Sequence, residues 1–138
     1  FISTLDQVIV MSVVPGKSGQ KYIENTHEKT KNLMSSLKEN NFTGYIEADG
    51  GVTLDNIGEC FADGARAFVG GSAIIGQTDV RLVIREFRNQ VLRTRRKLLI
   101  QKANELGGTE LVNKWIDLHV LGKKKDELTQ IATELGYQ

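Results

Sequence analysis

Three short apolar segments in the first half of the sequence each end at glycine, and a stretch with helical periodicity follows each one. They are residues 6–14, 43–51 and 65–71. The first is a continuous run of mainly β-branched residues, which is typical of a parallel strand covered on both faces. Strands that alternate with helices predict βα units and a parallel sheet. We therefore expect an α/β fold, either a segment of a (β/α) barrel or a doubly wound sheet.

The segments between and after these runs have apolar residues at steps of three or four, which predicts amphipathic helices. We expect helices over residues 22–41, 57–64 and 80–91. From residue 94 onward, three more helical stretches follow without an intervening strand, and each ends at glycine. The sequence therefore predicts two domains, an α/β part over residues 1–93 and a helical extension over residues 94–138.

Composition excludes several classes of protein. The net charge of +1 gives no overall tendency to bind nucleic acid, although residues 1–80 carry 6 Lys and Arg against 10 Asp and Glu, and residues 81–138 carry 12 against 7. A basic second half could be a partner surface, but a solvated helix face is the simpler interpretation. The single Cys60 excludes an internal disulfide framework. No segment has membrane-spanning length or resembles a signal peptide, so we expect a cytoplasmic location and no membrane partner.

Glycine-rich loops follow the carboxyl ends of all three predicted strands, where parallel α/β folds bind ligands. Glycine lets backbone N–H groups approach an anion closely, and a following helix adds partial positive charge. A single loop of this kind is most simply a connector. For three loops at equivalent places, phosphate binding and a connector role are equally favoured. The candidate residues in these three glycine loops are Gly16, Lys17, Ser18, Gly19, Gly50, Gly51, Gly71 and Ser72.

A few other side chains could carry chemistry. Asp49 stands at a strand end beside a glycine pair, where a carboxylate can act as a general base, bind a metal or cap the next turn; the pattern alone favours the cap. Residues 16–18 read Gly-Lys-Ser but do not form a P-loop, because Met11 occupies the place of the required earlier glycine. Nucleotide triphosphate hydrolysis is therefore excluded. Neither His27 nor His119 has a ligand partner at metal spacing, and we expect both to be structural or surface groups.

The stretches VIVMSVVPGKSGQKYI, IEADGGV and FVGGSAI, in this order and spacing, resemble ribulose-phosphate 3-epimerases over about residues 5–90. The Met-x-x-x-Pro-Gly-x-x-Gly-Gln pattern is the most specific part. The resemblance implies a TIM (β/α)8 barrel, of which this chain supplies the C-terminal portion, strands 6–8. It also implies an isomerase of the pentose phosphate pathway that interconverts D-ribulose 5-phosphate and D-xylulose 5-phosphate. In that family two aspartates exchange the C3 proton, and a divalent metal ion (Zn, Fe, Mn or Co) stabilises the negative charge.

The resemblance assigns roles to residues that match the family's motifs. Asp49 matches the later catalytic aspartate, which also binds the metal, and Met11 matches a methionine that lines the pocket. The three glycine loops match the phosphate and substrate loops. The chain departs from the family at Val14, where a polar residue is common, at Lys17, which replaces an aromatic residue, and at Ser18, which replaces glycine. Lys17 could bind the phosphate or alter the substrate, or could equally be a solvated loop residue.

The strands that carry the other aspartate and the two metal-binding histidines of the family are not in this sequence, which starts at Phe1. We therefore expect the chain to be inactive alone, and to pair with the missing part or with another copy. One alternative is a 3-epimerase of another ketose phosphate, such as D-allulose 6-phosphate. Another is a non-catalytic sugar-phosphate sensor. Nucleic acid is not an expected partner, because residues 123–137 resemble the first helix of a helix-turn-helix but no recognition helix follows.

Overall fold

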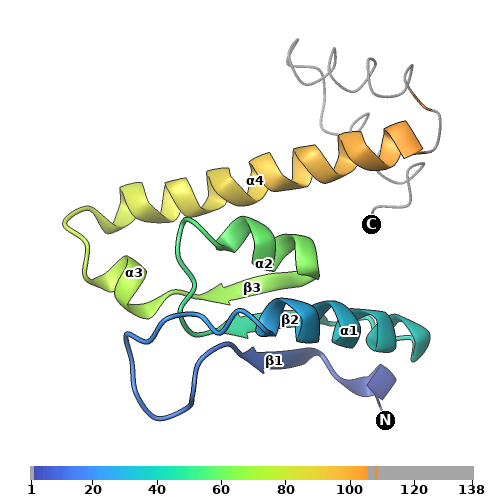
Figure 1. Ribbon diagram of the computed structural model, residues 1–138, viewed down its shortest axis with the longest axis horizontal. Coiled ribbons are helices and arrows are strands. Elements are labelled where there is room, and N and C mark those ends of the chain that lie inside the picture. Colours follow the sequence, from blue (N-terminus) through green and yellow to red (C-terminus); the bar gives the residue numbers. More distant parts are fainter. Residues whose placement is uncertain (1, 106–107, 109–138) are drawn as a thin grey trace. The chain divides into compact units, whose positions relative to one another are not determined.

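The computed structural model describes residues 2–105 and 108 (Figure 1). The chain divides into two compact units, Phe1–Thr94 and Arg95–Gln138. All of the candidate site residues belong to the first unit. Of the second, the structure describes the end of one helix and Gly108. The helices expected over residues 109–138, and His119 with them, lie outside the described residues.

A parallel sheet of three strands forms the centre of the first unit. Its strands are β1 (Gln7–Met11), β2 (Tyr45–Asp49) and β3 (Ala65–Val69), and they lie in the order β1-β2-β3. A short 3-10 helix, Ile2–Thr4, precedes β1. Neighbouring strands that run parallel need a crossover between them, and each crossover here contains a helix. The predicted α/β fold with a parallel sheet is therefore confirmed.

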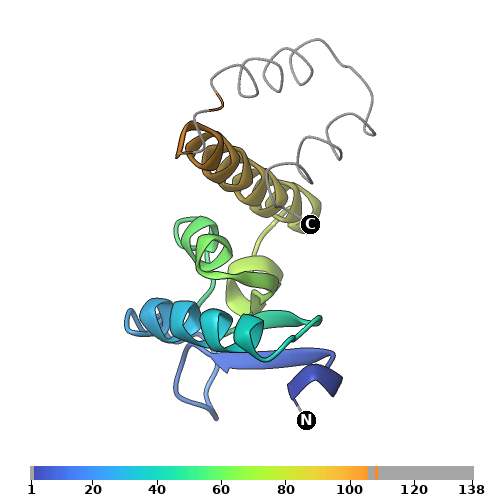
Figure 2. The same ribbon diagram turned by 90° about the vertical axis from the view of Figure 1, so that its right-hand side faces the viewer.

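Four α-helices accompany the sheet: α1 (Thr26–Glu39), α2 (Ile57–Asp63), α3 (Gly71–Ile75) and α4 (Val80–Glu105). In Figures 1 and 2, α1 lies next to β1 and α2 next to β3. α2 ends at Gly64, as expected, where the backbone has a φ of +123°. Within the described residues, none of the helices is long and apolar enough to cross a membrane.

Two helix boundaries differ from the prediction. α1 begins at Thr26 rather than at residue 22, because the N–H of Ile23 donates to the carbonyl of Ser12 and holds that segment against the end of β1. α4 is one helix where two were expected. No glycine or proline interrupts residues 92–95, so nothing in the sequence stops the helix there. The predicted division into two domains at residue 93 would fall within α4.

The hydrophobic core lies on one face of the sheet. Ile46 and Ala48 of β2 are buried there against Leu37 of α1, Ile57 of α2 and Phe87 of α4. On α4, the basic residues between the core positions are exposed, which fits a solvated helix face; they are Arg81, Arg85 and Arg88.

The other face of the sheet is open among the described residues. Side chains alternate between the two faces along a strand. In β1, Val8 and Val10 are half-buried, whereas Ile9 and Met11 are 54% and 40% exposed. Val69 of β3 is 40% exposed as well. The first strand was expected to be covered on both faces, but among the described residues helices cover one face and leave Ile9 and Met11 on the other exposed.

Candidate functional site at the strand ends

The register of the sheet brings the ends of the three strands together. Met11 is the partner of Asp49 across β1 and β2, and Asp49 is the partner of Val69 across β2 and β3. The three glycine loops therefore leave the sheet at the same edge. The candidate residues from three separate parts of the sequence are neighbours at this edge, which is where ligands bind in parallel α/β folds.

Ser12 links the end of β1 to the end of β2, and sequence reasoning did not identify it. Its backbone N–H donates to the carbonyl of Asp49 at 2.8 Å. Its hydroxyl lies 2.9 Å from that same oxygen and 2.6 Å from the carbonyl oxygen of Gly50. The side chain is fully buried. The available signal was a small polar residue interrupting an apolar run, which indicates a position where backbone groups need a partner.

The loop after β1 is closed by Gln20. Its side-chain amide donates to the carbonyls of Val14 and Lys17, both at 2.6 Å. Gly16 and Gly19 have φ values of +107° and +74°, and a Cβ at either would meet nothing within 4 Å. Glycine is therefore needed here for its conformation rather than for space. The hydrogen bonds of Gln20 hold the loop backbone in a defined shape, and the side chains of Lys17 and Ser18 are exposed.

The loop after β2 requires glycine for both reasons. Gly50 and Gly51 have φ values of +109° and +65°. A Cβ on Gly50 would lie 2.3 Å from a methyl carbon of Val13, and one on Gly51 would lie 2.5 Å from the backbone nitrogen of Tyr22. The loops after β1 and β2 are therefore in direct contact, with no room for a side chain between them.

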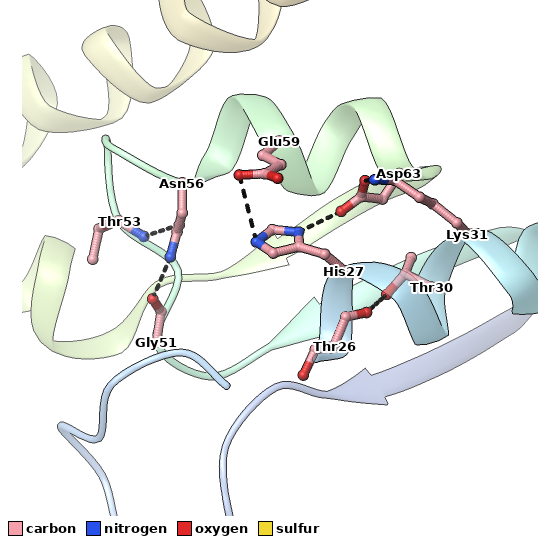
Figure 3. A network of polar contacts seen from close by, with 9 residues as sticks. All are labelled: Thr26, His27, Thr30, Lys31, Gly51, Thr53, Asn56, Glu59 and Asp63. Carbon is pink, nitrogen blue, oxygen red and sulfur yellow. Dashed lines mark hydrogen bonds and ion pairs between the residues drawn. The ribbon is translucent and has the colours of Figure 1, made fainter. Parts of the chain in front are cut away.

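Asn56 closes the turn that follows Gly51 (Figure 3). Its side-chain nitrogen donates to the carbonyl of Gly51 at 3.0 Å, and its side-chain oxygen accepts from the N–H of Thr53 at 2.8 Å. The sequence pattern favoured Asp49 as the cap of this turn, but the structure gives that role to Asn56. The carboxylate of Asp49 is half-buried and has no hydrogen-bond donor among the described residues.

The loop after β3 leads directly into a short helix. Gly71 is the first residue of α3 and Ser72 the second, and both residues are exposed. A Cβ on Gly71 would meet nothing within 4 Å. No side chain caps the first turn of α3. α3 therefore begins directly after the carboxyl end of β3, at the same end of the sheet as the other two loops.

The described residues do not form a metal centre by themselves. Among them, no group of three or more His, Cys, Asp and Glu side chains could hold a metal ion. Asp49 offers carboxylate oxygens at the strand ends, while His27 lies between α1 and α2 with Nδ1 hydrogen-bonded to Asp63. A divalent ion at this edge would need ligands from residues outside the described ones.

Two further ionisable groups lie between the loop and α2. Burial raises the pKa of the Tyr22 hydroxyl, and its hydrogen bond to Cys60 raises that pKa further. Burial also raises the pKa of the Cys60 thiol, which is 1% exposed. Both groups therefore stay protonated near neutral pH. They act as packing groups rather than as bases or nucleophiles.

Comparison with known proteins gives a consistent result. Residues 1–75 match the family model described as the ribulose-phosphate 3 epimerase family. A ribulose-phosphate 3-epimerase of Escherichia coli is 44% identical over 87 residues, which are 63% of this chain and 39% of that protein. Proteins of the same name from Serratia marcescens and Methanocaldococcus jannaschii are 43% and 34% identical over 56% and 70% of this chain, or 37% and 41% of their own lengths. The chain thus spans about two fifths of the length of these curated relatives.

Proposed function

Since the chain belongs to the ribulose-phosphate 3-epimerase family, we propose that its strand ends form one side of the active site of a ketose-phosphate 3-epimerase. The substrate is D-ribulose 5-phosphate, and inversion at C3 gives D-xylulose 5-phosphate. One observation carries the proposal: the register that brings Asp49, Met11 and the three glycine loops to one edge of a parallel sheet. The similarity to enzymes of that name supports the choice of reaction.

The open face of the sheet supports a place in a (β/α)8 barrel. In such a barrel, helices cover the outside of the strands, and bulky side chains from the strands fill the interior. Here helices cover one face, and the other exposes Ile9, Met11 and Val69. We propose that this face is part of the barrel interior and that β1, β2 and β3 correspond to strands 6–8. The active site would then lie at the carboxyl ends of the strands.

Asp49 is the proposed acid or base. Its half-buried carboxylate has no donor among the described residues, so it is available to a substrate. As base it takes the proton from C3, and the electrons of the C3–H bond move into an ene-diolate. A second acid on the opposite face of the sugar then returns a proton to C3 and inverts it. This second group comes from outside the described residues. Met11, 40% exposed next to Asp49 in the sheet, would line the pocket beside the reacting carbons.

The glycine loops are the proposed phosphate ligands. Backbone N–H groups in loops of positive φ can converge on an anion, and glycine leaves them accessible. The N–H groups at the start of α3 would add partial positive charge. Lys17 is exposed in the loop that Gln20 closes, so its ammonium group would reach the phosphate from the solvent side. The proposed contacts come from Gly16, Lys17, Ser18, Gly19, Gly50, Gly51, Gly71 and Ser72.

A divalent metal ion is the cofactor that the family implies, and Asp49 would be one of its ligands. The described residues do not complete such a site, so no step above depends on the ion. When bound, it would stabilise negative charge on the substrate oxygens. Because the described residues supply one proposed acid–base group and an incomplete ligand set, we expect that the chain does not catalyse epimerisation by itself.

The test is to supply the missing part from a relative. In a hybrid protein, residues 1–90 replace the matching segment of the Escherichia coli enzyme, and formation of D-xylulose 5-phosphate is measured. We expect the hybrid to be active, the chain alone to be inactive, and Asp49→Asn in the hybrid to lower kcat by about 10³-fold. Asp6→Asn, beyond the opposite ends of the strands, is the matched control and should change little. An active Asp49→Asn hybrid would refute the role of Asp49, and D-allulose 6-phosphate as a better substrate would reassign the reaction.

A further inference from the structure

A network of polar groups centred on two buried side chains, His27 and Asp63, joins α1 to α2, outside the proposed active site (Figure 3). His27 of α1 is 8% exposed. Its Nδ1 is hydrogen-bonded to Asp63 of α2, and its Nε2 lies 3.7 Å from a carboxylate oxygen of Glu59. Nζ of Lys31 lies 3.2 Å from the other carboxylate oxygen of Asp63. Both nitrogens of the imidazole therefore face a carboxylate.

Burying this pair costs free energy, because a carboxylate taken out of water needs compensating donors. The side chain of Asp63 is 1% exposed, and His27 is hydrogen-bonded to its Oδ2. The ammonium group of Lys31 forms an ion pair with Oδ1, which has no hydrogen-bond partner among the described residues. A buried pair of this kind contributes little net stability, but it restricts the side chains to one arrangement. The hydrogen bond at Nδ1 sets the orientation of the His27 ring in particular.

The orientation of His27 matters because its ring packs on Tyr22. The two ring centroids are 4.7 Å apart, with the planes inclined by 34°. The side chain of Tyr22 also interacts with that of Cys60, which is buried on α2. Tyr22 thus packs against His27 on one face and interacts with Cys60 of α2. These contacts fix a residue that precedes α1 and belongs to no regular element.

The backbone of Tyr22 is in turn the surface against which Gly51 packs. A Cβ on Gly51 would lie 2.5 Å from the nitrogen of Tyr22 and 2.8 Å from its Cα. On the other side, Asn56 holds the carbonyl of Gly51 at 3.0 Å. Any displacement of Tyr22 therefore changes the space that the Gly50–Gly51 loop can occupy.

From these contacts we infer that His27 is a positioning residue for the Gly50–Gly51 loop, acting through Tyr22, and that Asp63 sets the orientation of its ring. The first part of the inference, that His27 keeps the backbone of the Gly50–Gly51 loop ordered, rests on contacts within this chain. The consequence for phosphate binding rests on the proposed function. The two parts are therefore tested by different measurements.

The experiment uses the full chain and compares three variants. His27→Ala removes the ring and leaves Asp63 buried with one donor fewer, so a general loss of stability is expected. The double variant His27→Leu with Asp63→Ala leaves neither a buried charge nor an unpaired polar group, and it should restore the melting temperature. Asp63→Asn keeps an acceptor for the N–H of His27. Lys29→Ala, at an exposed position on α1, is the control.

The first readout is the backbone order of Gly50 and Gly51 from amide relaxation without any anion. Positioning by His27 predicts lower order in the double variant despite its restored stability, with native order in Asp63→Asn and Lys29→Ala. Native order in the double variant would overturn the inference, because packing alone would then suffice.

The second readout is the affinity for inorganic phosphate, followed by the shifts of the same amides. We expect about a tenfold loss in the double variant, as one misplaced donor would cause. If the native chain binds no phosphate, the proposed phosphate loop is wrong, while the relaxation measurement still decides the role of His27.

Discussion

At the scale of single residues, the glycines at the strand ends differ in what they require. Gly51 has a φ of +65°, and an added Cβ would lie 2.5 Å from a backbone atom of Tyr22 that cannot move away by a rotamer change. Gly71 has open space around its Cβ position. Glycine pairs that look alike in the sequence therefore differ in how strictly they require glycine. Only the tertiary contacts show the difference.

This difference gives a prediction for two alanine variants. Gly51→Ala should lower the free energy of unfolding by about 2–4 kcal/mol, because it combines left-handed strain with a clash against backbone. Gly71→Ala should change it by less than about 1 kcal/mol, and in the stabilising direction, since alanine favours a helix. Urea unfolding followed by circular dichroism measures both. Equal losses in the two variants would contradict the close approach of Gly51 to Tyr22.

Cys60 gives a second prediction at this scale. Burial raises the pKa of its thiol, so the reactive thiolate is scarce below that pKa and increases as pH rises. We expect iodoacetamide at pH 8 to modify the native chain at least about 10²-fold more slowly than the urea-unfolded chain. Mass spectrometry over time gives the two rates. Equal rates would place the thiol at the surface.

At the scale of elements, periodicity and strand-end glycines were enough to predict the order of strands and helices. They also predicted that Asp49 and the glycine loops meet at the carboxyl ends of the strands, because parallel strands align these ends. The place of Met11 beside them was implied only by the family resemblance. Ser12 could not be assigned, since its role depends on carbonyls that lie 37 and 38 residues away. The hydrogen bond between His27 and Asp63, which are 36 residues apart, could not be predicted for the same reason. The local sequence pattern predicts the helices and strands, whereas these contacts depend on how the helices and strands pack together.

Ser12 provides the prediction that belongs to this scale, because it connects β1, β2 and the segment before α1. Ser12→Ala removes the donor to the carbonyl of Gly50 and should destabilise the chain by about 1–3 kcal/mol. Ser35→Ala, at an exposed position on α1, is the matched control and should stay within about 0.5 kcal/mol. Thermal and urea unfolding of both variants test this. A Ser12 variant as stable as the control would show that the hydroxyl does not tie the two strand ends together.

At the scale of the whole molecule, the open face of the sheet is the feature that most affects behaviour in solution. Ile9, Met11, Tyr45 and Val69 are each at least 40% exposed on this face. Exposed apolar side chains beside the edge strand β1 favour association with another chain. This is the physical basis of the expected pairing with further strands of a barrel or with a second copy.

A charge on this face should therefore weaken association without disturbing the core. Ile9 is 54% exposed, so Ile9→Lys should leave the unfolding transition nearly unchanged while it shifts the chain toward the monomer in sedimentation velocity over a range of concentrations. Leu82→Lys is the control, because Leu82 is 43% exposed on α4 instead. If the Leu82 variant dissociates and the Ile9 variant does not, association occurs through α4 and the open face is not the contact surface. If both variants remain associated at all concentrations, the copies associate through backbone pairing of the edge strand β1 rather than through the open face.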